Sequence, residues 1–188
     1  MYRLLADISL STKTGILGGC KISNWREHVK SASSQTKIKT YTHIAIMKSS
    51  WKLLPKILSG EKIVESRWYK TKACPWNRVF PGDTIYFKDS GKPVTLKARV
   101  TRVQQYILES SEDATSLFLQ IKNKDLGIKG LTKKDIPQHV LDYISNKKYA
   151  IFVWFANVQK VKPFNIDKKG FGMQAAWLCA KDVADIMI

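Results

Sequence analysis

Cysteine, histidine and acidic residues are all scarce in this sequence. Its three cysteines stand far apart and form no CxxC pair, so neither a disulfide framework nor a zinc knuckle is expected. Its three histidines lack the spacing of metal ligands, and the sequence therefore predicts no metal site and no bound cofactor. Cysteine usage of this kind is typical of a reducing compartment, which favours a cytoplasmic protein.

Several motifs and segments are missing as well. The chain contains no GxSxG, no GxxxxGKS/T and no GxGxxG, which are motifs of serine hydrolases, P-loop nucleotide hydrolases and dinucleotide-binding proteins. No run of apolar residues approaches the roughly 18 that a membrane span needs. Asp7 interrupts the apolar stretch near the first residue, so no signal peptide is expected. These absences predict a chain that does not enter a membrane.

Basic residues, by contrast, are abundant: 32 Lys and Arg stand against 15 Asp and Glu, a net charge of +17. The excess is uneven, since residues 48–102 hold 13 basic and 4 acidic residues whereas residues 103–144 hold 5 and 6. A basic half beside a near-neutral segment predicts one electropositive face. Such a face favours a polyanionic partner, and nucleic acid ranks ahead of an anionic membrane surface.

Hydrophobic patterning predicts a mixed domain in which strands outnumber helices. Residues 1–40 are expected to be an N-terminal extension that packs on a domain at 41–188. The expected strands are 43–47, 62–69, 83–87, 94–103, 149–158 and 171–180. The expected helices follow the capping residues Ser49 or Ser50, Ser110 and Thr132, with a short helix at 183–188 and an interhelical turn at 127–130. This order predicts an α+β fold, a small and mostly antiparallel β-barrel with flanking helices.

The most specific pattern in the chain is Gly60–Arg67, with the sequence GEKIVESR. A helix stops here, and a lysine, a carboxylate and an arginine follow within eight residues. Written as GxKxxExR, and followed by the turn at 81–83 and a hydrophobic strand, the pattern resembles the signature of the ASCH domains, which belong to the PUA-like superfamily of β-barrels. The resemblance covers residues 42–180 in element order and is closest over 49–103. It implies a barrel with a cleft beside the first helix.

In that family the signature lysine, glutamate and arginine line the cleft, which is taken to be a nucleic-acid site; the matching residues are Lys62, Glu65 and Arg67. Their chemistry is suitable, because an arginine can hold a phosphate or a base edge through two hydrogen bonds. A lysine supplies a point charge or, when desolvated, a base, and Glu65 could orient either one. The alternative is that Glu65 and Arg67, two residues apart on one strand face, form a structural ion pair.

Aromatic residues alternate with basic ones directly after the signature. Single-stranded nucleic acid needs this combination, since aromatic faces stack on bases and cations meet phosphates. The residues concerned are Trp68, Tyr69, Lys70, Lys72, Trp76 and Arg78. The alternative is that both tryptophans are core residues and that the charges solvate a loop.

A second group of candidates stands at the start of the first expected helix. Backbone N–H groups and hydroxyls at such a position suit a phosphate. The residues are Lys48, Ser49, Ser50 and Trp51. An ordinary helix cap is the simpler interpretation of the two serines.

Charge, the aromatic segment and the resemblance together predict a nucleic-acid-binding domain, with RNA ranked above DNA. A hydrolase acting on RNA or on a modified nucleoside is the first alternative, because the resemblance extends to ASCH proteins assigned ribonuclease activity and to others that deacetylate N4-acetylcytidine. The threonine nucleophile of those deacetylases falls at Glu65 of this chain, which argues against that reaction. A ribonuclease would use Lys62 and Glu65, with Tyr69 or Ser66 nearby, and no metal. A protein-interaction adaptor is the third hypothesis.

Overall fold

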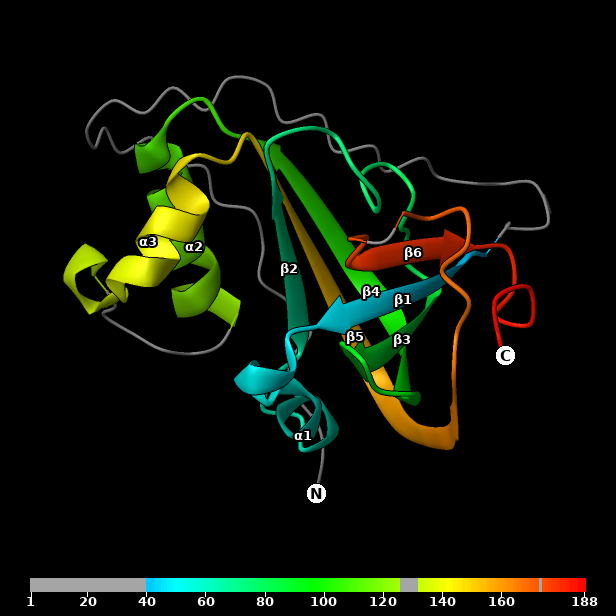
Figure 1. Ribbon diagram of the computed structural model, residues 1–188. Helices are drawn as coiled ribbons and strands as arrows, with labels where there is room; N and C mark the ends of the chain where they lie inside the picture. The colour runs from blue at the N-terminus through cyan, green and yellow to red at the C-terminus, as the bar shows by residue number, and fades with distance from the viewer. Residues whose placement is uncertain (1–39, 126–131, 173) are drawn as a thin grey trace, which may run out of the picture. The chain divides into compact units, whose positions relative to one another are not determined.

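Six β-strands and three α-helices make up the described part of the chain, which comprises residues 40–125, 132–172 and 174–188 of a computed structural model (Figure 1). The strands are β1 (Thr42–Met47), β2 (Val64–Tyr69), β3 (Thr84–Asp89), β4 (Val94–Ile107), β5 (Tyr149–Phe164) and β6 (Trp177–Ala180). The helices are α1 (Leu53–Leu58), α2 (Ser111–Asp125) and α3 (Gln138–Ser145), with the 3-10 helices η1 (Ser49–Trp51) and η2 (Lys133–Asp135). The expected N-terminal extension and the expected turn at 127–130 lie outside the described residues.

All six strands belong to one sheet, with the order β2-β5-β4-β3-β1-β6. β1 and β3 run parallel, and the other four pairings are antiparallel. Such a sheet with helices packed against it is the α+β, mostly antiparallel architecture that the sequence predicts.

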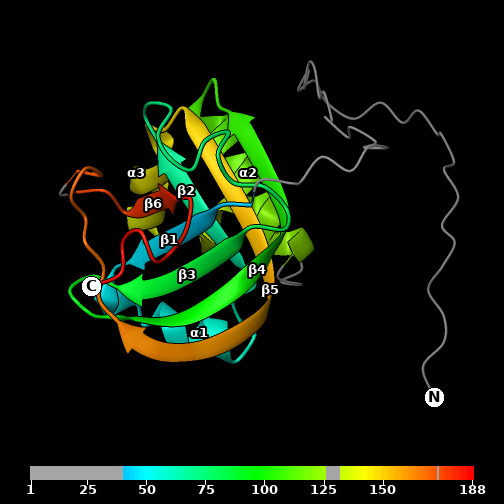
Figure 2. The same ribbon diagram turned by 90° about the vertical axis from the view of Figure 1, so that its right-hand side faces the viewer.

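The sheet is curled, and the two long strands β4 and β5 make the curl possible (Figure 2). Their pairing shifts register at three places between Val94 and Arg102. An extra residue on one strand bends that strand and increases the local twist, so each long strand can continue around the curl of the sheet. β2 and β6 are the outermost strands, and the barrel is therefore open. We call the gap between β2 and β6 the seam.

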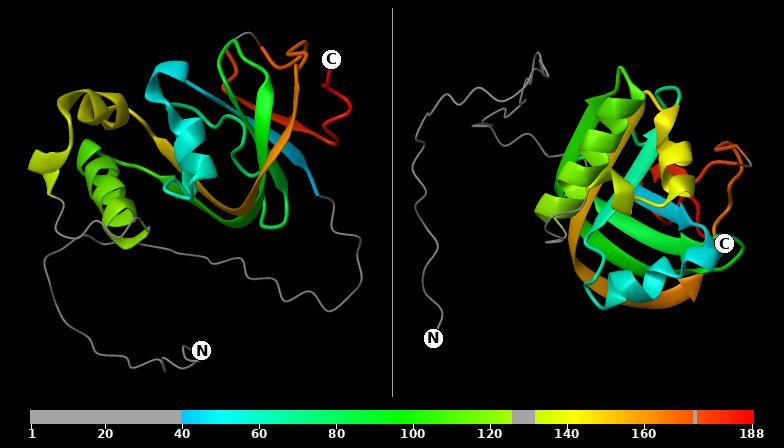
Figure 3. Two further views of the ribbon diagram at one scale, coloured as in Figure 1. Left: turned by 90° about the horizontal axis from the view of Figure 1, so that it is seen from below. Right: turned by 90° about the vertical axis from the view of Figure 1, so that its left-hand side faces the viewer.

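β2 has one face toward the helices and one toward the inside of the curl. Val64 and Trp68 are buried in a hydrophobic cluster with apolar residues of α2 and α3, which cover this part of the sheet (Figure 3). Since side chains alternate along a strand, Glu65, Arg67 and Tyr69 point to the inner face. Tyr69 accordingly packs against the inner cluster, to which α1 also contributes. The pattern of β2 thus places three polar side chains at the inner edge of the seam.

The C-terminal part differs from its prediction. The strand predicted over 171–180 is confined to Trp177–Ala180, and 183–188 contains no helix. Gly172 adopts a φ of +84°, which interrupts extended backbone. Met187 forms a bridge with Ile166 instead, so this segment gains its hydrogen bonds by pairing with the chain that follows β5.

Candidate functional site at the seam

The signature residues meet around one carboxylate at the start of β2. The Nζ atom of Lys62 lies 3.0 Å from Oε2 of Glu65, and Nη2 of Arg67 lies 3.1 Å from Oε1. The exposed fractions of the three side chains, Lys62, Glu65 and Arg67 in turn, are 20%, 7% and 13%. Two cations on one carboxylate leave an excess positive charge in a largely buried place. We call these three residues the charged cluster. The ion pair that the sequence suggests between Glu65 and Arg67 is present. The role of the cluster in binding is still a prediction.

Gly60 explains how Lys62 reaches the cluster. After α1 ends, Gly60 takes a φ of +78°, which a glycine adopts without steric cost. The chain folds back so that the N–H of Lys62 donates to the carbonyl of Lys56 at 2.8 Å. The Lys62 ammonium then donates to the carbonyl of Val64 at 2.5 Å as well as to the carboxylate. An ammonium has three donors, so one is left for a further acceptor.

Arg67 crosses the seam from β2 to the strands on the other side. Its Nη2 donates to the carbonyl of Ile46 in β1 at 3.2 Å. Its guanidinium lies over the ring of Trp177 in β6, 5.4 Å from the ring centroid, in a cation–π arrangement. The Nε of Arg67 is buried and has no hydrogen-bond partner among the described residues. The guanidinium therefore ties the two edges of the open barrel together and still has hydrogen-bonding capacity.

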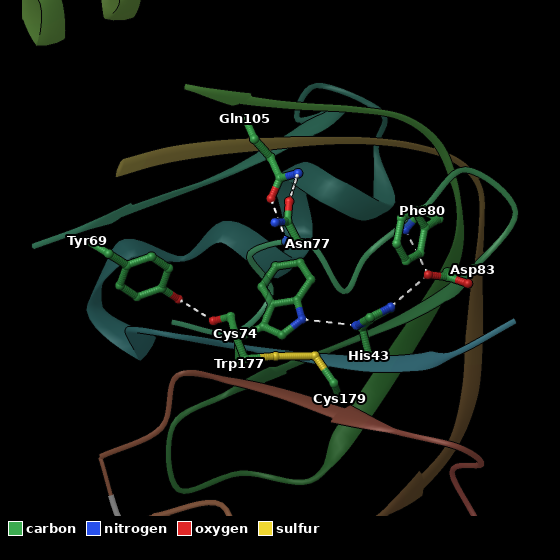
Figure 4. Close-up of a disulfide and its surroundings, with 9 residues drawn as sticks. All are labelled: His43, Tyr69, Cys74, Asn77, Phe80, Asp83, Gln105, Trp177 and Cys179. Atoms are coloured by element: carbon green, nitrogen blue, oxygen red, sulfur yellow. Dashed lines mark hydrogen bonds and ion pairs between the residues drawn. A yellow bond between two sulfur atoms is a disulfide. The ribbon is translucent and has the colours of Figure 1, made fainter. Parts of the chain in front are cut away.

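A buried chain of hydrogen bonds fixes Trp177 beneath Arg67 (Figure 4). The indole Nε1 of Trp177 donates to Nδ1 of His43 at 3.2 Å, and Nε2 of His43 lies 2.9 Å from Oδ2 of Asp83. Because an indole N–H only donates, Nδ1 must accept, and the imidazole proton is on Nε2, facing Asp83. Burial lowers the pKa of His43 below its ordinary value, although the hydrogen bond and charge of Asp83 act to raise it. His43 is therefore a neutral link in this chain.

Two residues that sequence reasoning missed lie on the helices and interact electrostatically with the charged cluster. Burial lowers the pKa of Lys122 on α2, and the positive charges of Lys62 and Lys56 lower it further. Burial raises the pKa of Tyr143 on α3. The positive charge of Arg67 opposes this rise, and the negative charge of Glu65 adds to it. These mutual effects show that α2 and α3 bring a cation and a phenol within electrostatic reach of the cluster. No pattern in the sequence relates either residue to the signature.

The aromatic residues after the signature divide between core and surface. Trp68 is a core residue, 5% exposed, whose ring meets that of Phe152 edge to face, so its predicted stacking on a base is wrong. Trp76 is half-buried, and its ring meets that of Tyr149 edge to face at 5.0 Å between centroids. The hydroxyl of Tyr69 donates to the carbonyl of Cys74 at 3.0 Å in the half-buried wall of the seam. The alternative of core tryptophans thus holds for Trp68.

The basic residues of the same segment are all exposed. Lys70, Lys72 and Arg78 reach solvent from the loop that follows β2. The ammonium of Lys72 lies 5.8 Å from the centroid of the Tyr149 ring. These charges remain available to a phosphate near the seam.

Of the candidates before α1, Ser49, Ser50 and Trp51 form η1, and Lys48 directly precedes it. Neither η1 nor α1 has a side-chain cap hydrogen bond, and Lys52, in the left-handed region at a φ of 50°, separates the two helices. The prediction that Ser49 or Ser50 caps the helix is therefore wrong, because the chain turns between them and α1. Trp51 is 58% exposed, and the Nζ of Lys48 lies 5.9 Å from its ring centroid. Trp51 and Lys48 are therefore still candidate contacts for a nucleic acid, as an exposed ring beside a cation.

A pocket of about 440 Å³ opens beside the charged cluster. Aromatic, small and polar residues from β2, the loop after it, the segment before β6 and β6 itself share its wall. They are Tyr69, Ala73, Cys74, Arg78, Gly170, Phe171, Gln174, Ala175, Ala176, Trp177 and Cys179. Tyr69 and Trp177 belong both to this wall and to the seam, so the pocket and the cluster are neighbours.

Cys74 and Cys179 form a disulfide in the wall of this pocket (Figure 4). The sequence predicts no disulfide, and that prediction is wrong. The two cysteines are 105 residues apart, and only the curl of the sheet brings the loop after β2 to β6. With this disulfide present, the cysteine content no longer favours a reducing compartment.

Other kinds of site are not found in the described part of the chain. It holds no group of three or more His, Cys, Asp or Glu residues arranged to bind a metal ion. Within the same residues, no helix has the length and apolar character needed to cross a membrane.

Comparison with solved structures finds proteins that bear the family name to which the signature points. The crystal structure of ASCH from Zymomonas mobilis matches with a TM-score of 0.44 and 18% identity, over 68% of this chain and 75% of that chain. A variant of the same protein with a tyrosine changed to phenylalanine matches with a TM-score of 0.44 and 16% identity, over 68% and 77%. No protein-family model matches the chain, and no curated protein matches it either.

Proposed function

We propose that this protein binds nucleic acid, RNA in preference to DNA, at the charged cluster on the seam. The observation that carries the proposal is the arrangement of Lys62 and Arg67 on the single buried carboxylate of Glu65. This arrangement holds two cations in place and leaves an excess positive charge. A phosphate that binds there meets side chains that are already ordered. The entropy cost of immobilising these side chains therefore does not reduce the free energy of binding.

The surroundings of the charged cluster suit the same partner. Trp51 and Tyr143 are exposed aromatic side chains, and Lys70, Lys72 and Arg78 are exposed cations. Bases of a single strand stack on exposed rings while its phosphates meet the cations. The preference for RNA follows from the resemblance of the signature to that of the ASCH domains.

Fluorescence anisotropy with single-stranded and double-stranded RNA and DNA tests the proposal. We expect the full-length protein to bind single-stranded RNA most tightly. The logarithm of the binding constant should fall linearly with the logarithm of the salt concentration, because phosphate contacts release counterions. A protein that binds none of the four probes at low salt has another function, and a protein partner would then be the first to seek.

Single substitutions locate the binding site. Lys62→Ala and Arg67→Ala should each weaken RNA binding about tenfold, as expected for the loss of a charge-assisted hydrogen bond, with the circular dichroism spectrum unchanged. Lys160→Ala is the matched control, because it removes one exposed charge from β5 and should change affinity far less. If the two cluster variants bind as tightly as the Lys160 variant, the charged cluster is not the site.

The geometry favours binding over hydrolysis. Both carboxylate oxygens of Glu65 are engaged by cations, which makes Glu65 a poor base. The hydroxyl of Tyr69 donates to a carbonyl, and burial, reinforced by the charges of Tyr143 and Glu65 and opposed by Arg67, raises its pKa, so it is not prepared to act as a nucleophile. RNA recovered from the binding mixtures should run intact on a gel, and a ladder of products would instead establish a hydrolase.

A further inference from the structure

The pocket beside the charged cluster has the composition of a site for a flat, polarisable ring. Three of its lining side chains are aromatic, Tyr69, Phe171 and Trp177, and its lining includes no carboxylate. Arg78 is the charged residue of the lining and is exposed, and Gln174 adds an exposed amide. A volume of about 440 Å³ lies within the range of pockets that hold small molecules, which are mostly apolar with a few polar groups.

The position of the pocket connects it to the proposed phosphate site. Tyr69 is two residues after Arg67 on the inner face of β2, and Trp177 lies beneath the Arg67 guanidinium. A strand whose phosphate meets Arg67 therefore has its neighbouring base at the mouth of the pocket. Arg78 is an exposed cation on the wall of the same pocket.

We propose that this pocket takes one unpaired nucleobase of the bound strand. The proposal rests on the proposed function and adds to it the feature of the nucleic acid that is recognised. The half-buried rings of Tyr69 and Phe171 supply stacking partners, the Gln174 amide can both donate to and accept from a base edge, and Arg78 meets the adjoining phosphate. A base inside a duplex is stacked and paired and must first be extruded, which costs a few kcal/mol, so the pocket selects single strands, loops and bulges.

The test compares a short single-stranded RNA with the same strand lacking one base. In the wild-type protein, removal of the central base should weaken binding about tenfold, the size of one base–aromatic stacking contact. In Phe171→Ala and in Gln174→Ala the intact strand should bind more weakly and the missing base should matter little. A 2-aminopurine placed at the same position should change its fluorescence on binding to the wild type and much less on binding to either variant.

The controls separate this proposal from the proposed function. Phe80→Ala removes an exposed phenylalanine ring that does not line the pocket, and should leave the effect of the missing base unchanged. Gln174 is exposed, so its variant is expected to fold even if the Phe171 variant does not. If the wild type binds RNA but loses nothing when the base is removed, or if both pocket variants behave like the Phe80 variant, the pocket holds no base and the charged cluster still binds phosphate. If the wild type binds no RNA at all, both proposals fail.

Discussion

At the scale of single residues, Glu65 does most to shape the candidate site. It is buried between Lys62 and Arg67, each within 3.1 Å of one of its oxygens. Removing one partner of a buried ion pair generally costs about 3–5 kcal/mol, because the remaining charge has no compensation. The loss of Glu65 would leave two cations facing each other. Its place in the site is therefore to hold the two cations.

His43 makes the stability of the protein depend on pH. Its folded-state pKa lies below its ordinary value because of burial, so between the two values the unfolded chain binds more protons than the folded protein. Stability is then complete above the ordinary value of about 6.5 and is lost as the pH falls below it, by up to about 1.4 kcal/mol per pH unit from this group. Urea unfolding measured from pH 7.5 to 5.0 should show this loss.

Substitution of the imidazole provides the control for that prediction. His43→Gln removes the titrating group, and the slope of stability against pH just below 6.5 should flatten relative to the wild type. NMR of the wild type gives a second measurement that needs no variant: His43 should be mostly neutral, with its proton on Nε2, at pH 6.5, where an ordinary imidazole is half protonated. A slope unaffected by the substitution, or an imidazolium at that pH, would contradict the prediction.

The residues of the site that sequence reasoning found are those that are close in the sequence. Lys62, Glu65 and Arg67 share one turn and one strand, and the alternation of side chains along β2 puts the last two on the same face. Trp177 meets the Arg67 guanidinium from β6. No local pattern encodes such a contact, since it depends on how the sheet curls and where the helices pack.

At the scale of elements, the start of α2 is stabilised by the capping residues that the sequence predicts. Ser110 and Asp113 exchange hydrogen bonds as a capping box: the N–H of Asp113 donates to Ser110 Oγ at 3.1 Å, and the N–H of Ser110 donates to Asp113 Oδ2 at 3.1 Å. Ser110→Ala should lower the free energy of unfolding by about 1 kcal/mol, because the first turn of the helix loses the acceptor for an otherwise unpaired N–H. Urea denaturation measures the change.

Ser116→Ala is the matched control for the cap. Ser116 is exposed inside the same helix, where alanine is the better helix former, so this variant should be as stable as the wild type or slightly more stable. Equal destabilisation by the two substitutions would show that the capping box contributes nothing.

The elements themselves were predictable where pattern and turn chemistry agree. The alternation of Val94, Leu96, Ala98 and Val100 predicts the inward face of β4, and all four side chains are buried. The extent of β4 and β5 was not predictable, because the bulges that let them continue arise from pairing between the two strands. The same holds for 183–188, whose hydrophobic spacing suits a helix but which pairs with the segment after β5.

At the scale of the whole fold, the disulfide joins the loop after β2 to β6 across the seam. Replacing both cysteines, as Cys74→Ser with Cys179→Ser, should lower the free energy of unfolding by about 4 kcal/mol, because the bond closes a loop of 105 residues in the unfolded chain. Urea unfolding with and without dithiothreitol measures the effect.

The reductant supplies the control for this prediction. Dithiothreitol should bring the wild type close to the double variant and should leave the double variant unchanged. A wild type that is equally stable with and without the reductant, and that shows two free thiols at positions 74 and 179 by mass spectrometry, would mean that the bond does not form.

The order of strands in the sheet affects how the nascent chain folds during translation. β1 and β2 are translated early, yet β1 pairs with β6 and β2 pairs with β5, both of which leave the ribosome much later. Until then β1 can pair only with β3, which leaves its other edge open, and β2 has no partner strand; unpaired strand edges of this kind are prone to associate with other chains. Non-local pairing also slows folding. We therefore expect chaperones to meet this protein during synthesis, with Thr42–Met47 and Val64–Tyr69 as the segments in need of protection.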